Sequence, residues 1–298
     1  MTNDGNMTRA YLALAAICII WGTTYTAIKY AVRDFPPFLL VGIRQTAAGL
    51  LLLGIAWMSG RFVWPNPQYA FRQTVTGLAT ITGGNGFITW GMQYVSSGLA
   101  ALIGSLTPVM VVLISLTWQG SERINTRVVL GVLLGFGGLA LIFSEGWQDF
   151  MKPEYRWGIA GCFASCFTWS LGTVMAKQWN APQVSPLLNA GLQIFAGGLG
   201  GLALSALFDS SHAIHHTVES WASMLYLVVV GSALAFTFYM YALKHLSATV
   251  SSLYTYINPV VAILLGWLWL GEALTVEIAV GMVVTIAGVW LVNVGARR

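Results

Sequence analysis

A single arginine lies in the middle of a long apolar stretch near the start of the chain, and its chemistry gives the first hypothesis. Arg44 stands seven residues after Pro37, about 10 Å along a helix that rises 1.5 Å per residue. A guanidinium presents a planar fork of donors that matches a carboxylate, so Arg44 is a candidate for binding an acidic group of a small molecule. The alternatives are an anchor that hydrogen-bonds between helices, or a side chain that extends to a polar interface.

Aromatic residues are abundant, with 13 Trp, 11 Tyr and 14 Phe, and several of them stand inside apolar stretches rather than at their ends. A ring with a polar tip can line a cavity that accepts an aromatic or amphipathic solute. For any one ring, packing between helices is the alternative. The candidates for such a cavity are Trp21, Tyr25, Trp90, Trp169, Tyr239 and Tyr254.

Uncharged polar residues inside the apolar stretches indicate the same kind of site. Asn85 stands among glycines, while Thr107 and Asn258 directly precede Pro108 and Pro259. In lipid such polar groups need partners, so they face protein or water. A proline inside a helix removes a backbone hydrogen bond and can kink the helix. We therefore predict that Asn85, Thr107 and Asn258 contact the solute and that the two prolines are hinges, with a purely structural kink as the alternative.

The interior of the apolar stretches holds no obvious set of catalytic or metal-binding groups. None of the ten acids lies deep in a stretch, His245 stands alone near an end, and no Gly-rich nucleotide-binding loop is present. Cys162 and Cys166 share a helix face but have no further ligands nearby. Three histidines crowd one polar segment, where a solvated loop is expected: His212, His215 and His216. These observations argue against an enzyme, and we expect no metal and no cofactor.

The composition identifies the environment of these residues as a lipid bilayer. Mean hydropathy is +0.73, and 57% of the 298 residues are apolar while only 8% are charged. An ordinary soluble domain has about 25% charged residues, because it must cover its surface. The net charge of +4 is spread singly between apolar stretches, which does not form the basic patch that nucleic-acid binding requires.

Ten stretches approach the 20 apolar residues that a spanning helix needs. If both termini are cytoplasmic, nine Lys and Arg lie inside and four outside, as the positive-inside rule favours. We expect an all-α, multi-pass membrane protein. The predicted spans are 11–31, 38–58, 72–92, 97–118, 126–144, 157–177, 186–207, 221–243, 248–270 and 275–294.

The two halves of the chain are similar to each other. Trp21 and Lys29 match Trp169 and Lys177 at a shift of 148, and Pro108 matches Pro259 at a shift of 151. Further matches pair Gly42 with Gly191, Glu122 with Glu272, and Gly138 with Gly288, and Arg44 has the uncharged mate Gln193. We predict two five-helix domains, 1–146 and 147–298. Because five is odd, the second copy would be inverted in the membrane, an arrangement typical of secondary transporters.

The order of several motifs resembles the ten-span, EamA-type exporters of the drug/metabolite transporter superfamily, in the class that exports amino acids and other metabolites. The motifs are Trp21-Gly-Thr-Thr-Tyr25 running to Lys29, Arg44 in the second span, the segment from Tyr94 to Val109, and His245-Leu-Ser-Ala-Thr with Pro259-Val ahead of Gly271-Glu272. The likeness covers essentially the whole chain. It implies export of a small organic solute across a bacterial inner membrane.

Together these features predict a secondary transporter that works by alternating access. Aromatic or amphipathic amino acids are the favoured solutes, and nucleosides, drugs or other metabolites are the alternative; an intramembrane enzyme or a channel fits less well. The lack of deep acids argues against proton coupling. The partners are a solute and the bilayer. The glycines Gly131-x-x-x-Gly135, with Gly281 and Gly288, predict close helix packing, within a monomer or between subunits of a homodimer.

Overall fold

The computed structural model describes residues 2–119, 126–145, 152–179, 184–209, 217–252 and 254–296. Within these ranges the regular elements are all helices. The loop with His212, His215 and His216 lies outside the described residues, as does Glu122, so the match of Glu122 with Glu272 is not visible in space.

The first half of the chain contains helices that follow one another with short connections. The third helical rod consists of α3, a π-helical segment η1 and α4 in direct succession. The bounds are α1 (Thr2–Ala31), α2 (Pro37–Met58), α3 (Pro67–Gly77), η1 (Leu78–Asn85), α4 (Gly86–Gly91), α5 (Ser97–Gly104), α6 (Thr107–Gln119) and α7 (Thr126–Glu145).

The second half repeats this order. A π-helical segment, η2, again stands in the third rod, so the positions of η1 and η2 differ by 149 residues. The bounds are α9 (Pro153–Gln178), α10 (Pro186–Phe208), α11 (Val218–Tyr226), η2 (Leu227–Leu234), α12 (Ala235–His245), α13 (Ala248–Ser251), α14 (Tyr254–Leu265), η3 (Gly266–Leu270) and α15 (Val276–Ala296).

Six segments of the described chain are helical, long and apolar enough to cross a membrane, whereas the sequence predicts ten spans. Two shorter apolar helices, Ile257–Leu270 and Val276–Gly288, have the same character. The six segments are Asn6–Ala31, Pro37–Met58, Ser97–Ser115, Pro153–Gln178, Pro186–Phe208 and Val218–His245.

Local sequence explains where the helices begin. α2, α3, α9 and α10 each start at a proline, which suits the first helical turn because its missing N–H has no partner there. The side chains of Asn66, Ser96, Ser185 and Thr217 accept hydrogen bonds from the first turns of the helices that follow them. Gly271 ends η3 with φ of 68°, a left-handed conformation that favours glycine.

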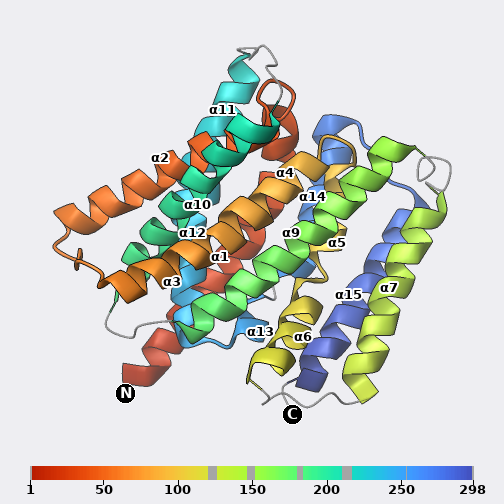
Figure 1. Cartoon of the computed structure of the whole chain (residues 1–298). Helices are drawn as coiled ribbons and strands as arrows, with labels where there is room; N and C mark the ends of the chain where they lie inside the picture. Colours follow the sequence, from red (N-terminus) through yellow and green to blue (C-terminus); the bar gives the residue numbers. More distant parts are fainter. Residues whose placement is uncertain are drawn as a thin grey trace.

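Corresponding helices of the two halves pack against each other. α2 lies along α10, and α7 lies along α15 at one edge of the molecule (Figure 1). Small residues allow both approaches: a Cβ on Gly49 would meet the Phe195 backbone at 2.6 Å, and one on Gly138 would meet the Gly281 carbonyl oxygen at 2.6 Å. The glycines predicted for close packing therefore serve contact within one chain.

The centre of the molecule is formed by α1 and α9. α1 contacts α12 and α14 of the second half, and α9 contacts η1, α4 and α6 of the first half. In Figure 1 α1 rises from the lower end, which also holds both termini, whereas α9 descends from the upper end. Each of these helices thus packs mainly against the half of the chain to which it does not belong.

We predict that Gly138→Val weakens the α7–α15 contact and lowers the free energy of unfolding by about 1–3 kcal/mol, as is usual for overpacking. Gly137→Val is the matched control, because a Cβ at Gly137 meets nothing within 4 Å. Thermal unfolding of the purified protein in detergent measures the difference. Equal unfolding temperatures for the two variants would contradict the close packing.

Candidate functional site

A cavity lies between the two halves and is lined by residues of both. It offers about 90 Å³ to the centres of water molecules, against roughly 10–15 Å³ for one buried water. Its walls come from α1, α2, η1, α4, α5 and α6 of the first half, and from α9, η2, α12 and α14 of the second. Among the side chains that the structure describes, those of the paired edge helices α7 and α15 do not line the cavity.

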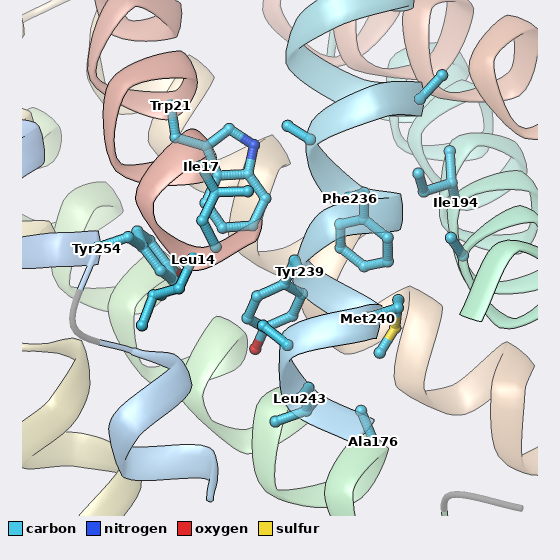
Figure 2. Close-up of a cluster of buried hydrophobic side chains, with 14 of the residues drawn as sticks. Leu14, Ile17, Trp21, Ala176, Ile194, Phe236, Tyr239, Met240, Leu243 and Tyr254 are labelled. Atoms are coloured by element: carbon cyan, nitrogen blue, oxygen red, sulfur yellow. The ribbon is translucent and has the colours of Figure 1, made fainter. Parts of the chain in front are cut away.

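Two tryptophans at matched positions of the halves touch each other at this cavity. The ring centroids of Trp21 on α1 and Trp169 on α9 are 5.4 Å apart, with the rings at 88°, an edge-to-face geometry that aromatic pairs prefer. Tyr254 packs on Trp21 with centroids 4.6 Å apart, and Tyr239 contacts both tryptophans at 5.3 and 5.9 Å. Figure 2 shows Trp21, Tyr239, Tyr254 and Phe236 converging from three helices.

This aromatic cluster continues into a dry core toward the end of the molecule that holds the termini. Tyr239 is 1% exposed, and Leu14, Ile17, Met240 and Leu243 lie buried around and beyond it (Figure 2). On α1 the cavity lining extends from Trp21 to Ile28, away from that core. The aromatic cluster and the buried residues beyond it therefore separate the cavity from the end that holds the termini.

Arg44 is the positively charged residue in the cavity lining. Its side chain is 3% exposed, and its Nη2 donates to Asn85 Oδ1 at 2.5 Å. The lining contains no carboxylate, and Arg44 Nε has no hydrogen-bond partner within the described residues. Further buried atoms of the lining, among them Gln45 Oε1 and Ser232 Oγ, are likewise unpartnered there. Buried polar atoms normally have partners, so this wall can bind a polar ligand.

The π-helical segments supply carbonyl acceptors to the opposite half of the chain. Trp21 Nε1 donates to the carbonyl of Gly231 in η2 at 3.0 Å, and Ser165 Oγ donates to the carbonyl of Gly84 in η1 at 2.6 Å. π-Helical turns occur frequently at functional sites. These two bonds join the central helices to the third rod of the other half, on the wall of the cavity.

Most of the aromatic and polar residues selected from the sequence line the cavity, and two do not. Tyr239 lies behind the tryptophans, where its hydroxyl forms a 2.6 Å hydrogen bond with that of Thr173. Trp90 packs against Tyr94, with centroids 5.5 Å apart, and lies close to Gly161. The lining includes Trp21, Tyr25, Arg44, Asn85, Thr107, Trp169, Tyr254 and Asn258.

The sequence did not single out several other lining residues. Ile28, Ile88 and Phe236 are apolar, and nothing in their local sequence distinguishes them from packing residues. Gln45, Ser165 and Ser232 are polar residues deep in apolar stretches, which is a usable signal. Cys166, which the sequence excludes as part of a metal site, lines the cavity, and its sulfur lies 3.7 Å from Thr107 Oγ1.

The two predicted hinge prolines occupy different positions in their helices. Pro108 is the second residue of α6, directly after the break that separates α5 from α6. Pro259 is the sixth residue of α14. It therefore stands about one helical turn farther from the start of its helix than Pro108 does. Asn258, in the amide orientation that satisfies its neighbours, donates to the carbonyls of Cys18 at 3.1 Å and Tyr254 at 3.0 Å. It therefore ties α14 to α1.

Matched lysines hold matched helix ends. Lys29 Nζ donates to the carbonyls of Met92 and Val95, both at 2.7 Å. Lys177 Nζ donates to those of Leu243 and Leu246 at 2.8 and 2.6 Å. In each half these carbonyls lie at the end of the third rod, in the same half as the lysine that binds them. A cation at this position also stabilises the negative end of the helix dipole.

Apolar spanning helices around a buried, partly polar cavity define an integral, multi-pass membrane protein of the transporter class. Comparison with known proteins agrees with this class. The model of the EamA-like transporter family matches residues 8–144 and again residues 156–294. The chain therefore belongs to the EamA-like transporter family, with the family's domain present twice.

Relatives of similar length carry transporter names. The inner membrane transporter YedA of Escherichia coli is 29% identical, over 95% of this chain and 90% of its own. The transporter YvbV of Bacillus subtilis is 28% identical, over 97% of this chain and 93% of its own. A crystal structure of a protein 22% identical in sequence matches 97% of this chain and 99% of its own with a TM-score of 0.71, which shows a shared fold.

We predict that Lys29→Met and Lys177→Met each lower the free energy of unfolding by about 1.5–3 kcal/mol, since each removes charge-assisted hydrogen bonds to helix-end carbonyls. Arg33→Met is the control, because Arg33 is exposed and lies one turn after Lys29. Thermal unfolding in detergent compares the variants. A loss from Arg33→Met as large as that from Lys29→Met would argue that general charge, rather than these bonds, matters.

Proposed function

We propose that the protein is a secondary transporter that moves a small organic solute through the cavity by alternating access between its two halves. The observation that carries this proposal is the cavity at the Trp21–Trp169 contact, lined by both halves and separated from one end by a buried aromatic cluster. A carrier needs a binding site that a single conformational change closes toward one side of the membrane and opens toward the other side. The described conformation is the one closed toward the termini.

The proposal includes ten spanning helices arranged as two inverted five-helix domains, 1–146 and 147–298. Each predicted span coincides with one helix or with consecutive helical segments. The opposite directions of α1 and α9, the matched π-helical segments, and the pairing of α2 with α10 and α7 with α15 support the inverted relation. Such repeats bind solute near the bilayer midplane, between the repeats.

For the solute we propose an amino acid with an aromatic or amphipathic side chain. The buried guanidinium of Arg44 suits the carboxylate, and the unpartnered Gln45 Oε1 and Ser232 Oγ can accept hydrogen bonds from the ammonium group. The rings of Trp21, Trp169 and Tyr254 suit the side chain. Export is the direction that the family resemblance favours. Nucleosides, drugs and other metabolites remain the alternative solutes.

We propose facilitated diffusion or solute antiport rather than proton coupling. Three of the described acids already bond to helix starts: Asp209 accepts from Leu39 N at 2.8 Å, Glu272 from Ser97 N at 2.9 Å, and Asp34 from the hydroxyls of Thr217 and Ser220. No acid lines the cavity within the described residues. Accumulation of solute in proteoliposomes driven by a pH gradient alone would overturn this choice.

The orientation that we propose places both termini in the cytoplasm of a bacterium, with the chain in the inner membrane. In Figure 1 both termini lie at the lower end. α3 and α7, which carry Arg72 and Arg127 near their first residues, also start there, whereas Asp34, Asp209 and Glu272 follow helices that end at the opposite side. This distribution supports a cytoplasmic lower end. A monomer suffices for the site, and a homodimer is compatible with it.

Trp21→Ala and Trp169→Ala are each expected to abolish carrier-mediated flux, because each removes half of the central ring contact. Trp57→Ala, at a side chain that is 64% exposed, is the control and keeps the flux of the parent protein. Counterflow of radiolabelled amino acids in proteoliposomes measures this. Saturable counterflow marks a carrier, and non-saturating flux in the parent would instead indicate a channel.

Arg44→Gln is expected to weaken binding of an amino acid roughly 10- to 100-fold, the loss of a charge-assisted hydrogen bond in a buried site. The amide derivative of the same amino acid lacks the carboxylate, so its weaker binding should change little between parent and variant. Thermal-shift titration of the purified proteins gives both affinities. An equal loss for acid and amide would exclude carboxylate recognition by Arg44.

The inverted arrangement predicts that the loop after α2 and the start of α11 face opposite sides of the membrane. Ser59→Cys and Glu219→Cys place single exposed thiols at these positions, in a chain whose native cysteines at 18, 162 and 166 are buried. An impermeant maleimide applied to intact spheroplasts should label position 219 and leave position 59 unlabelled until lysis. Labelling of both positions from one side would refute the inversion.

A further inference from the structure

A second hollow, separate from the solute cavity, opens at the end of the molecule that holds the termini. It lies between residues 9–16 of α1, the start of α10, residues 237–241 of α12 and Arg61 just after α2, and it offers about 470 Å³ to the centres of water molecules. It shares no lining residue with the solute cavity. We call it the α1–α10–α12 groove.

The groove is cationic at its rim and apolar at depth. Arg9 near the start of α1 and Arg61 just after α2 form the rim. Both side chains are exposed, and no acidic side chain of the described part of the chain pairs with either. The mostly apolar wall begins one turn deeper on α1 at Leu12 and reaches Ala16, seven residues from Arg9, or about 10 Å along the helix.

The other two helices complete the wall of the groove. On α12, Phe238 and Tyr241 line the wall seven and four residues before the helix ends at His245. On α10, Leu187 follows Ser185 and Pro186 at the very start of the helix. The ring of Tyr241 stacks on His245 at the end of α12, with centroids 4.4 Å apart. The body of the groove is therefore lined mainly by apolar and aromatic side chains, together with Thr237 of α12.

We propose that the groove is a binding site for an anionic phospholipid, with the phosphate of the headgroup between Arg9 and Arg61 and the start of an acyl chain along Leu12, Ala16 and Phe238. Charge selects this occupant, because two unpaired arginines attract an anion and the surrounding bilayer supplies anionic lipid at high local concentration. Guanidinium groups also fit a phosphate with paired hydrogen bonds. A zwitterionic lipid offers the same chains with a less favourable headgroup.

The groove shares no lining residue with the solute cavity, and lipid binding is measured without transport, so the test is independent of the proposed function. Native mass spectrometry of the purified full chain, with equal amounts of phosphatidylglycerol and phosphatidylcholine of identical acyl chains, measures the preference. We expect bound phosphatidylglycerol to exceed phosphatidylcholine by about 25-fold, which is about fivefold for each arginine. Arg9→Gln and Arg61→Gln should each reduce that preference about fivefold, and the double variant should bring it near one.

Two further variants separate charge at the groove from charge in general. Arg9→Lys with Arg61→Lys keeps both cations and should keep most of the preference. Arg127→Gln removes a cation where α7 begins, at the same end of the molecule but on the α7–α15 edge, and should leave the preference unchanged. An unchanged thermal unfolding profile in lipid-free detergent shows that the glutamine variants are folded.

Four results would overturn the proposal. The first is equal binding of the two lipids to the parent protein, and the second is a preference that survives in the double glutamine variant. The third is a result from the same protein with inorganic phosphate in place of lipid. If phosphate protects the parent against thermal unfolding as well as the lipid does, the arginines form an ion site and the apolar wall plays no part. A dimer mass that replaces the lipid-bound monomer would likewise assign the groove to a second copy of the chain.

Discussion

A polar group inside a bilayer has no water to bond, and this constraint explains most of the contacts in this chain. Lys29 and Lys177 bond to the free carbonyls where helical rods end. Asp209 and Glu272 bond to the free N–H groups where helices begin. Against this background the unpartnered polar atoms on the cavity wall, among them Arg44 Nε, support the proposal that a polar solute binds there.

The sequence predicted the helical class, the membrane environment and the duplication because each depends on patterns that repeat along the chain. Trp21 and Trp169 could be selected because they share a repeat position, and their contact in space follows from a common place near the centre. Trp90 and Tyr239 have the same chemical character as the lining residues, yet they point elsewhere. The direction of a side chain depends on helix rotation, which a uniformly apolar stretch does not specify.

The sequence showed that Arg44 has an uncharged mate, but it did not show where the two side chains bond. Arg44 and Gln193 hold matched positions, but Gln193 donates to Gln73 Oε1 at 2.6 Å within the α10–α3 contact, while Arg44 reaches Asn85 on the cavity wall. The duplicated backbone thus carries one cationic wall rather than two. Likewise the matched prolines stand at different distances from the helix breaks, because the break depends on local packing as well as on proline.

The reciprocal bonds to the π-helical segments have a consequence for how the polypeptide can be divided. Trp21 finds its acceptor, Gly231, only in the second half, and Ser165 finds Gly84 only in the first. Cut between α7 and α9, either fragment would carry a buried donor whose acceptor resides on the other fragment. Neither fragment could satisfy its own buried donor in lipid, so both fragments would have to be present together for these two bonds to form.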